Sequence, residues 1–263
     1  LDALVVSGHP LADAETGAAH ACGHNAQVTA VLGATMALAA SRGMQHLGGR
    51  IVPFAVPAEE YGDIGWRLEQ VRAGRLEFLG GKPELIRDGH FDDVDMALLI
   101  HTTSRSEDSI AGVAASNNGC IVKTVRYVGR AAHAGSAPHL GINALYAANI
   151  ALTAINALRE TFHERDTIRV HPVITLGGKQ VNVIPGEVRL ETYVRGKTVQ
   201  AITDANIKVD RALRAGALAM GAQVEITTLP GYMPLENHRP LAKVFQQNAE
   251  ALFGADKYAN QGH

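Results

Sequence analysis

The spacing of hydrophobic and polar positions predicts an alternating α/β layer in the first hundred or so residues. Short apolar runs of strand type occur at 1–7, 50–56 and 94–101. Helices are predicted between and around them, at 25–41, 64–73 and 83–88. The first helix has apolar residues at Val28, Val31, Leu32, Met36 and Leu38, and Asn25 is expected to cap it. We expect this helix to pack closely against a sheet.

From about residue 110 the pattern changes to that of an antiparallel layer. Residues 119–129 alternate apolar and polar side chains, as a half-exposed strand should. Further strands are predicted at 167–176, 187–195 and 222–228, and helices at 143–161, 199–220 and 237–253. The order strand, helix, strand, strand, helix, strand is typical of a ferredoxin-like α+β domain. We expect it to be inserted at 113–229 into a first domain formed by 1–112 and 230–263.

The composition gives no support for several classes of binding partner. The 263 residues carry a formal net charge of −2 and 5% aromatic residues, so nothing favours binding to nucleic acid or to an anionic membrane surface. The longest apolar run, 28–40, is too short to span a bilayer. Two cysteines, Cys22 and Cys120, are too few for a disulfide framework and indicate a reducing compartment, the cytoplasm. The chain starts within a strand-like run without Met, so we expect residues to be missing at both ends.

Residues 20–25, His-Ala-Cys-Gly-His-Asn, combine a thiol with imidazoles at two-residue spacing. In an extended backbone, side chains at i and i+2 point the same way, so Cys22 and His24 could reach one ion. A thiolate with an imidazole suits zinc or a similar transition metal. The alternatives are that Cys22 is a small buried hydrophobic residue and that His24 only caps the following helix.

Acidic and histidine side chains follow two other predicted strands. Glu59 and Glu60 come directly after the strand at 50–56, and His101 ends the strand at 94–101. Open α/β sheets place their binding sites at the carboxyl ends of strands, so these groups could meet the Cys/His segment. A solvated acidic turn and a structural histidine are the alternative interpretations.

Taken in order, these motifs resemble one family of co-catalytic metallopeptidases, which includes aminoacylases, glutamate carboxypeptidases, auxin-conjugate amidohydrolases and p-aminobenzoyl-glutamate hydrolases. The resemblance rests on 20–25, Pro-Ala-Glu-Glu at 57–60, His101, His-Ala-Gly-Ser-Ala-Pro at 133–138, and Asn-Val-Ile-Pro at 182–185 followed by Arg195. Asn25, where many relatives carry Asp, makes the chain look closest to the aminobenzoyl-glutamate hydrolase and β-alanyl dipeptidase branch. The fold implied is a zinc-peptidase-like mixed sheet flanked by helices, with an inserted lid and dimerisation domain.

The resemblance implies a centre for one or two divalent ions, zinc first, with manganese or cobalt as alternatives. Its ligands would be Cys22, His24, Glu60 and His101. Glu59 would be the general base beside the metal, which would polarise the scissile carbonyl and acidify a bound water. Asp2 resembles the family's aspartate that orients a metal ligand.

In the inserted domain, the resemblance gives His133 the contact with the developing oxyanion, often across a dimer interface. Asn182 and Arg195 resemble the pair that binds a carboxylate. Without the family, these would be a loop histidine, a turn residue and a surface cation. The implied function is hydrolysis of an amide next to a free carboxylate, in an N-acyl amino acid, aminobenzoyl-glutamate or a dipeptide, by a homodimer formed through the lid.

Relatives supply a last histidine ligand from further along the chain. Only His238 and His263 occur late enough here, and we assign neither, since His238 precedes a helix start and would serve as its cap. A non-catalytic relative that binds ligands or dimerises is therefore an alternative. A plain α/β domain with coincidental motifs is a third possibility, which requires that Cys22, Glu60 and His101 do not converge.

Overall fold

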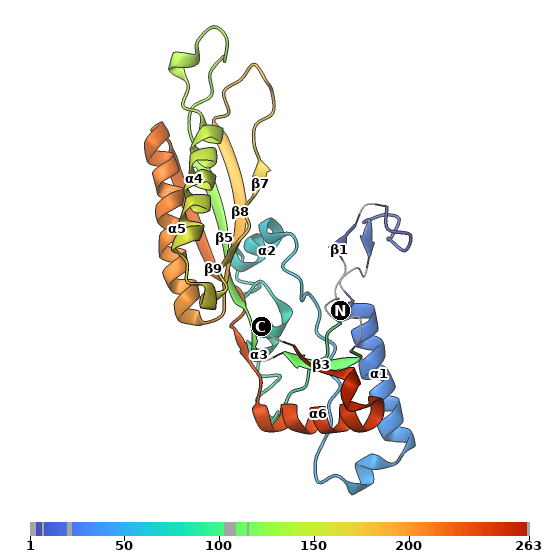
Figure 1. The fold of residues 1–263 in the computed structure, drawn as a ribbon. Coiled ribbons are helices and arrows are strands. Elements are labelled where there is room, and N and C mark those ends of the chain that lie inside the picture. The colour runs from blue at the N-terminus through green and yellow to red at the C-terminus, as the bar shows by residue number, and fades with distance from the viewer. Residues whose placement is uncertain (1–3, 7, 20–22, 103–108, 115, 262–263) are drawn as a thin grey trace. The chain divides into compact units, whose positions relative to one another are not determined.

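The computed structural model of the protein describes residues 4–6, 8–19, 23–102, 109–114 and 116–261. The chain divides into two compact units, Leu1–Glu107 and Asp108–His263. Together they form a mixed α/β fold (Figure 1). The domain boundaries expected from the sequence, 1–112, 113–229 and 230–263, remain a prediction.

The first unit is built mainly from helices and irregular segments. Its elements are β1 (Leu4–Val5), which pairs antiparallel with β2 (Ala18–Ala19), and the helices α1 (His24–Ala40), α2 (Ile64–Arg72) and α3 (Gly81–Arg87), with a 3₁₀ turn at Gly43–His46. The N-cap of helix α1 lies two residues earlier than predicted, at Gly23, which is in the left-handed region with φ 91°. The prediction of Asn25 as the cap is therefore wrong. Glycine adopts this backbone conformation without a steric cost, whereas asparagine pays one.

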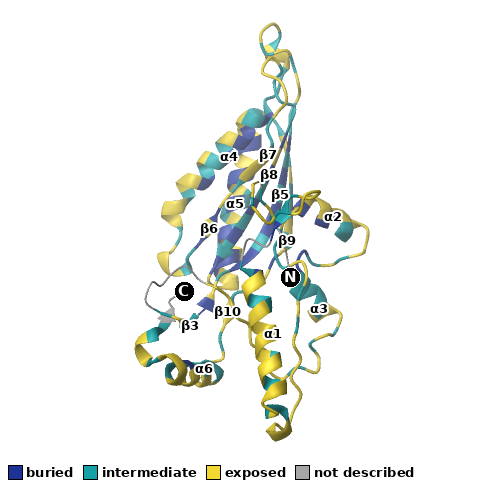
Figure 2. Cartoon of the chain, turned by 90° about the vertical axis from the view of Figure 1, so that its right-hand side faces the viewer, coloured by how far each residue is buried: buried dark blue, intermediate teal, exposed yellow. Residues whose placement is uncertain are grey.

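The predicted strands at 50–56 and 94–101 are not strands in the structure. A strand requires a hydrogen-bonded neighbour, and within the described residues neither segment has one. The apolar runs therefore predicted side chains that favour a strand, but they could not predict whether a neighbouring strand is present to pair with. Helix α1 is also largely exposed, with Leu32 58% and Met36 63% exposed, so within the described part of the chain it does not pack against a sheet as expected (Figure 2).

The second unit contains a five-stranded antiparallel sheet covered by two helices (Figure 1). Its elements are β5 (Gly119–Val128), α4 (Ala144–Leu158), β6 (Arg169–Val170), β7 (Val173–Leu176), β8 (Glu187–Gly196), α5 (Val199–Met220) and β9 (Gln223–Pro230). The strand order is β6-β8-β5-β9, and β7 also pairs with β8. The predicted strand at 167–176 is split, since Pro172 has no N–H to donate to a ladder.

The core of the second unit lies between this sheet and helices α4 and α5 (Figure 2). Tyr127, Leu190 and Leu213 are fully buried there, and the Tyr127 hydroxyl donates to the Leu213 carbonyl at 3.0 Å. Lys123 is also fully buried, but its ammonium group reaches Asp210 on α5 at 2.6 Å. Burial of a charged amine is tolerated because this carboxylate pairs with it.

The remaining elements of the second unit are two pairs of short strands, one helix and several 3₁₀ turns. β3 (Ala111–Ala114) runs parallel to β11 (Tyr258–Gln261), β4 (Ser116–Asn117) pairs antiparallel with β10 (Leu235–Glu236), and α6 spans Arg239–Phe253. Short 3₁₀ turns occur at Pro138–Leu140, Arg159–Thr161, Glu164–Asp166 and Ala255–Lys257. His238 occupies the N-cap position of α6, as expected, although its side chain makes no cap hydrogen bond within the described residues. Among the described residues, no helix has the length and apolar character needed to cross a membrane.

Candidate functional site

The loop that carries the two adjacent glutamates is held in place by hydrogen bonds to the carbonyl oxygen of Ala58. Ala58 has a positive φ of 53° and directs its carbonyl oxygen inward. That oxygen accepts a hydrogen bond from Gly81 N at 3.0 Å and one from the Arg67 guanidinium at 3.3 Å. Arg67 also donates to the carbonyl of Leu79. These contacts fix where the next two residues, Glu59 and Glu60, leave the loop.

His24, Glu59 and Glu60 form the cluster of metal-ligating side chains found among the described residues. One ligand atom of each lies within 4.8 Å of the others. His24 is 5% exposed at the start of α1, and its Nε2 lies 3.3 Å from Oε2 of Glu59. Both glutamates are half-buried. The structure thus brings together residues 24, 59 and 60, which the sequence places in two separate motifs.

Lys82 is a member of the site that sequence reasoning missed. Its Nζ lies 2.9 Å from Oε1 of Glu59. Burial raises the pKa of Glu59, but the hydrogen bond and charge of Lys82, with smaller contributions from His24 and His101, outweigh this and hold the pKa below its ordinary value. Glu59 is therefore kept ionised. Nothing in the local sequence pattern pointed to Lys82, because its contact depends on how α3 packs under the loop.

His101 does not belong to the three-residue cluster. Its side chain is exposed, and its Nδ1 lies 2.5 Å from the carbonyl oxygen of Thr102. It is still close enough for its charge to lower the pKa of Glu59. The two segments approach closely, since a Cβ on Gly23 would collide with the Thr102 side chain. Cys22, the remaining predicted ligand, and Asp2, predicted to orient a ligand, lie outside the described residues, so their roles remain predictions.

The donor atoms of the cluster suit a divalent metal ion. A buried imidazole and two carboxylates match the nitrogen and oxygen ligands of zinc and manganese sites. The charges are also suitable, since Glu59 remains ionised at neutral pH. The residues present therefore fit a metal centre.

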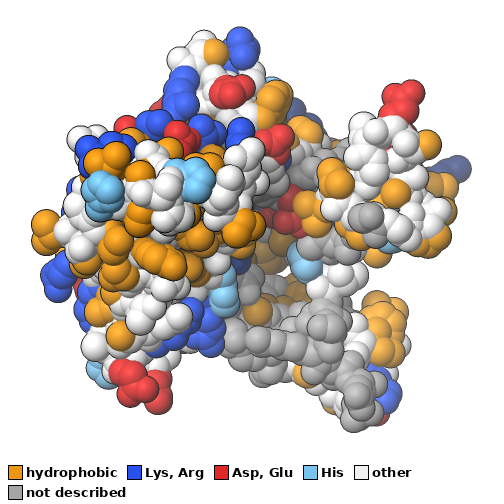
Figure 3. All heavy atoms as spheres, turned by 90° about the horizontal axis from the view of Figure 1, so that it is seen from above, with side chains coloured by type: hydrophobic (Ala, Val, Ile, Leu, Met, Phe, Trp, Pro, Cys, Tyr) orange, Lys and Arg blue, Asp and Glu red, His pale blue; other side chains and the backbone are white. Residues whose placement is uncertain are grey.

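His133 and Asn182 lie on two paired loops at one end of the five-stranded sheet. The backbone N–H of Ala134 donates to the Asn182 carbonyl at 2.9 Å, and His133 forms a bridge with Val183. Nδ1 of His133 accepts hydrogen bonds from the backbone at 3.1 and 3.2 Å. In neutral imidazole the proton is therefore on Nε2, which is able to donate. Figure 3 looks onto this end and shows histidine side chains among basic and hydrophobic ones.

Arg195 lies at the opposite end of β8 from the loops of His133 and Asn182. It pairs with Cys120 of β5, whereas Glu187 begins β8 at the loop end. At about 3.3 Å per residue, roughly 25–30 Å of strand separates Glu187 from Arg195. The structure therefore does not bring Asn182 and Arg195 together within one chain. Arg195 donates instead to the hydroxyl of Tyr232 at 2.9 Å.

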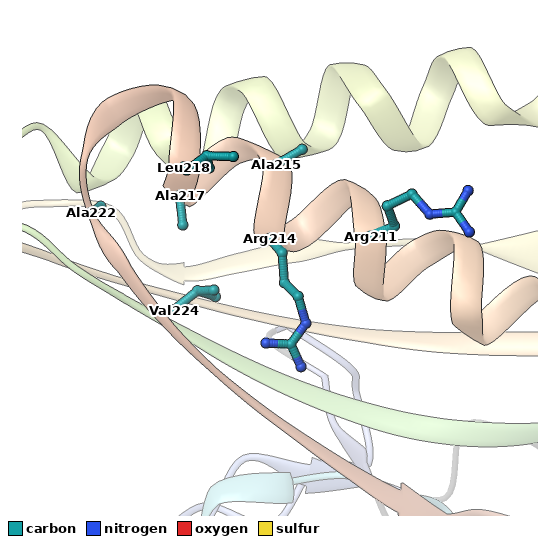
Figure 4. A pocket seen from close by; sticks show the side chains of 7 residues that line it. All are labelled: Arg211, Arg214, Ala215, Ala217, Leu218, Ala222 and Val224. Atoms are coloured by element: carbon teal, nitrogen blue, oxygen red, sulfur yellow. The ribbon is translucent and has the colours of Figure 1, made fainter.

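A surface groove of about 500 Å³ lies along α5 and the start of β9 (Figure 4). It has an apolar floor that includes Leu218 and Val224, and Arg211 and Arg214 flank it. It shares no residue with the histidine and glutamate cluster or with the loops of His133 and Asn182.

Known proteins resemble this chain over most of its length. It is 29% identical over 245 residues to the Xaa-Arg dipeptidase of Mus musculus, covering 91% of this chain and 51% of that protein. It is 30% identical over 208 residues to one of the subunits of p-aminobenzoyl-glutamate hydrolase from Escherichia coli K12, covering 78% of this chain and 38% of that protein. The chain thus spans about half the length, or less, of these curated relatives.

A solved structure shares the fold. The crystal structure of a proposed aminohydrolase from methicillin-resistant Staphylococcus aureus superposes with a TM-score of 0.67 at 23% identity, covering 100% of this chain and 66% of that one. The profile of peptidase family M20/M25/M40 matches residues 1–262. The family expected from the order of the motifs is therefore confirmed. The chain belongs to peptidase family M20/M25/M40.

Proposed function

We propose that this protein is a metal-dependent amidohydrolase that cleaves an amide bond next to a free carboxylate. The observation that carries the proposal is the convergence of His24, Glu59 and Glu60 within 4.8 Å. His24 and Glu60 would hold one or two divalent ions, zinc in the first place, together with Cys22 and His101. A bound ion would polarise the scissile carbonyl and acidify a water molecule.

Glu59 would act as the general base. Lys82 keeps it ionised and restrains one of its oxygens, while Oε2 faces the imidazole of His24. From this position Glu59 can take a proton from water and later pass it to the leaving nitrogen. Asp2 would orient one of the metal ligands. His133, with its proton on Nε2, would donate to the developing oxyanion.

The substrate class follows from the guanidinium of Arg195 and from the names of the relatives. A planar guanidinium is a good partner for a carboxylate. Relatives include p-aminobenzoyl-glutamate hydrolase, an indole-3-acetyl-aspartic acid hydrolase from Enterobacter agglomerans, and an N-acetyl-L-cysteine deacetylase from Bacillus subtilis. We infer an N-acyl amino acid, aminobenzoyl-glutamate or a dipeptide as substrate. A cytoplasmic location remains a prediction from the sequence.

The separation of the lid residues favours a homodimer. Asn182 and His133 lie at one end of the sheet and Arg195 at the other, so one chain does not offer them to the same small molecule. We propose that the layer at 113–229 serves as a lid and dimerisation domain. In this arrangement the loops of His133 and Asn182 act on the substrate that is bound by Arg195 of the other copy.

The test is an amidase assay on the full-length gene product. The protein is stripped with a chelator and reloaded with zinc, manganese or cobalt, and hydrolysis of N-acyl amino acids and aminobenzoyl-glutamate is measured. We expect metal-dependent release of the amino acid. At a carboxylate-substrate concentration at which His133→Ala and Arg195→Ala are each impaired, a mixture of the two proteins should recover part of the lost activity. If the protein hydrolyses none of these substrates with zinc, manganese or cobalt, the result would favour a protein that only binds ligands or dimerises.

A further inference from the structure

The five-stranded sheet has one face toward the helices and one face away from them. In β8, Val188, Leu190 and Val194 point into the helix-covered core. Because side chains alternate along a strand, Arg189 and Arg195 both lie on the open face. Their neighbours across the strands share this face, since directly paired residues point to the same side.

Arg189 is one of two arginines that face each other across a strand pair and share a carboxylate. Arg126 of β5 lies directly opposite Arg189. Glu187 bridges the two, with Oε2 2.8 Å from Arg126 and Oε1 2.7 Å from Arg189, and Glu225 adds a contact to Arg126 at 3.2 Å. Glu187 thus contacts both guanidinium groups, and together with Glu225 it balances their two positive charges.

Arg195 also faces another arginine across a strand pair, at the other end of the open face. Arg169 of β6 lies directly opposite it. Among the described residues, no carboxylate forms an ion pair with either of these two guanidinium groups. Like charges directly opposed on paired strands are destabilising. The position that Glu187 fills at one end of the sheet has no counterpart in the described chain at this end.

The side chain of Arg195 is held in place for a ligand. One of its terminal nitrogens donates to the Tyr232 hydroxyl at 2.9 Å, and its guanidinium carbon lies 5.1 Å from the centre of the Tyr193 ring. Tyr232 is itself fixed, since its carbonyl accepts from Cys120 N at 2.8 Å. The adjacent Gly231 lies so close to Cys120 that a Cβ would stand 2.6 Å from its sulfur. With respect to the described part of the chain, the other donors of Arg195 stay free to bind an anion.

We propose that the substrate carboxylate bridges Arg169 and Arg195, as Glu187 bridges Arg126 and Arg189, and that Tyr232 is the positioning residue for Arg195. Arg169 is then the second cation of the carboxylate subsite, and it contributes to the preference for a free carboxylate over an amide. This inference rests on the proposed amidohydrolase function and adds residues to its substrate site.

The test compares two substrates of the full-length, metal-loaded protein. One is the N-acyl amino acid that the wild type hydrolyses best, and the other is the same molecule with its carboxylate converted to a carboxamide. We expect Arg169→Gln to lower kcat/KM for the carboxylate substrate roughly 10- to 100-fold, mainly through KM, since a charge-assisted bond is lost. The carboxamide should change less than about twofold, and Arg169→Lys should restore part of the loss. Tyr232→Phe should act in the same direction with a smaller effect.

Lys197→Gln is the matched control, because it removes one exposed positive charge two residues from Arg195. It should leave both substrates within about twofold of the wild type. A second measurement needs no activity: the urea midpoint of the ligand-free protein should rise in Arg169→Gln, more at low salt, because the opposed charges are relieved.

The possible outcomes separate this inference from the proposed function. If Arg195→Gln discriminates against the carboxylate substrate and Arg169→Gln affects both substrates equally or neither, the bridge is overturned and the amidohydrolase stands. If the wild type hydrolyses neither substrate, the proposed function fails. In that case the urea midpoint decides, and a midpoint that does not rise in Arg169→Gln overturns the bridge as well.

Discussion

The imidazole Nε2 of His24 lies 3.3 Å from Oε2 of Glu59, while the other oxygen of the same carboxylate lies 2.9 Å from the ammonium group of Lys82. One glutamate is thus restrained from two sides by groups that favour its ionised form. A carboxylate in this position can accept a proton without itself being needed as a metal ligand.

This arrangement predicts a division of labour between adjacent glutamates. Glu59→Gln should keep the metal bound and reduce hydrolysis by at least about 10²-fold, because the amide cannot accept the proton. Metal content and turnover of the full-length gene product measure the two effects separately. Glu69→Gln, an exposed glutamate on α2, is the control and should retain both properties. A Glu59→Gln protein that still turns over normally would refute the role of the base.

Gly81 is predicted to be indispensable for the shape of the glutamate loop. A Cβ at this position would overlap the carbonyl group of Pro57, which is backbone and has little room to move. We expect Gly81→Ala to destabilise the protein by ~1–3 kcal/mol and to weaken metal binding. Gly33→Ala on α1 meets nothing within 4 Å and should instead stabilise by about 0.5–1 kcal/mol. Urea unfolding compares the two variants, and equal midpoints would contradict the prediction.

Arg195 is predicted to recognise the charge of the substrate. Arg195→Ala should raise KM for carboxylate substrates much more than for the corresponding amides, because only the former lose a charge-assisted hydrogen bond. Steady-state kinetics on both substrates measures this difference. An equal rise of KM for both would remove Arg195 from the carboxylate site.

Glu187 should make the second unit sensitive to acid. Its hydrogen bonds to Arg126 and Arg189 lower its pKa to about 2, below the ordinary value of 4.5. A depressed carboxyl pKa contributes stability that is complete above the ordinary value and is lost as the pH falls toward 2. The difference in urea midpoint between wild type and Glu187→Gln should therefore be constant above about pH 5 and shrink between pH 4.5 and 2. A difference that does not depend on pH would contradict this.

Local sequence signals were sufficient for the long helices and strands of the second unit, but they did not reveal the short strands β3, β4, β10 and β11. Helix α5 was predicted at the residues it occupies, 199–220, and the structure shows that Thr198 caps its start and Gly221 ends it. Strand β5 (Gly119–Val128) was predicted at 119–129 from the alternation of apolar and polar side chains. In the first unit, the apolar runs at 50–56 and 94–101 could not reveal that they lack strand partners among the described residues. Pairing depends on distant segments, which local periodicity does not encode.

The residues of the candidate site that belong to recognisable sequence motifs were predictable, and the others were not. The order of His24, Glu59 and Glu60 along the chain indicated the metal cluster and the family. Lys82 and Arg67 could not be found in this way, because their contacts with the loop depend on the packing of α2 and α3. The opposition of Arg169 and Arg195 depends on strand register, and the split of the predicted strand at Pro172 hid that register from the sequence.

The metal content of the full-length gene product tests the central claim most directly. After loading with zinc and removal of free metal, elemental analysis of the wild type should find one or two ions per chain. His24→Ala should lose at least one of them, because a buried imidazole ligand is removed. A wild-type protein that retains no divalent ion, or a His24→Ala protein that retains as much as the wild type, would contradict the account.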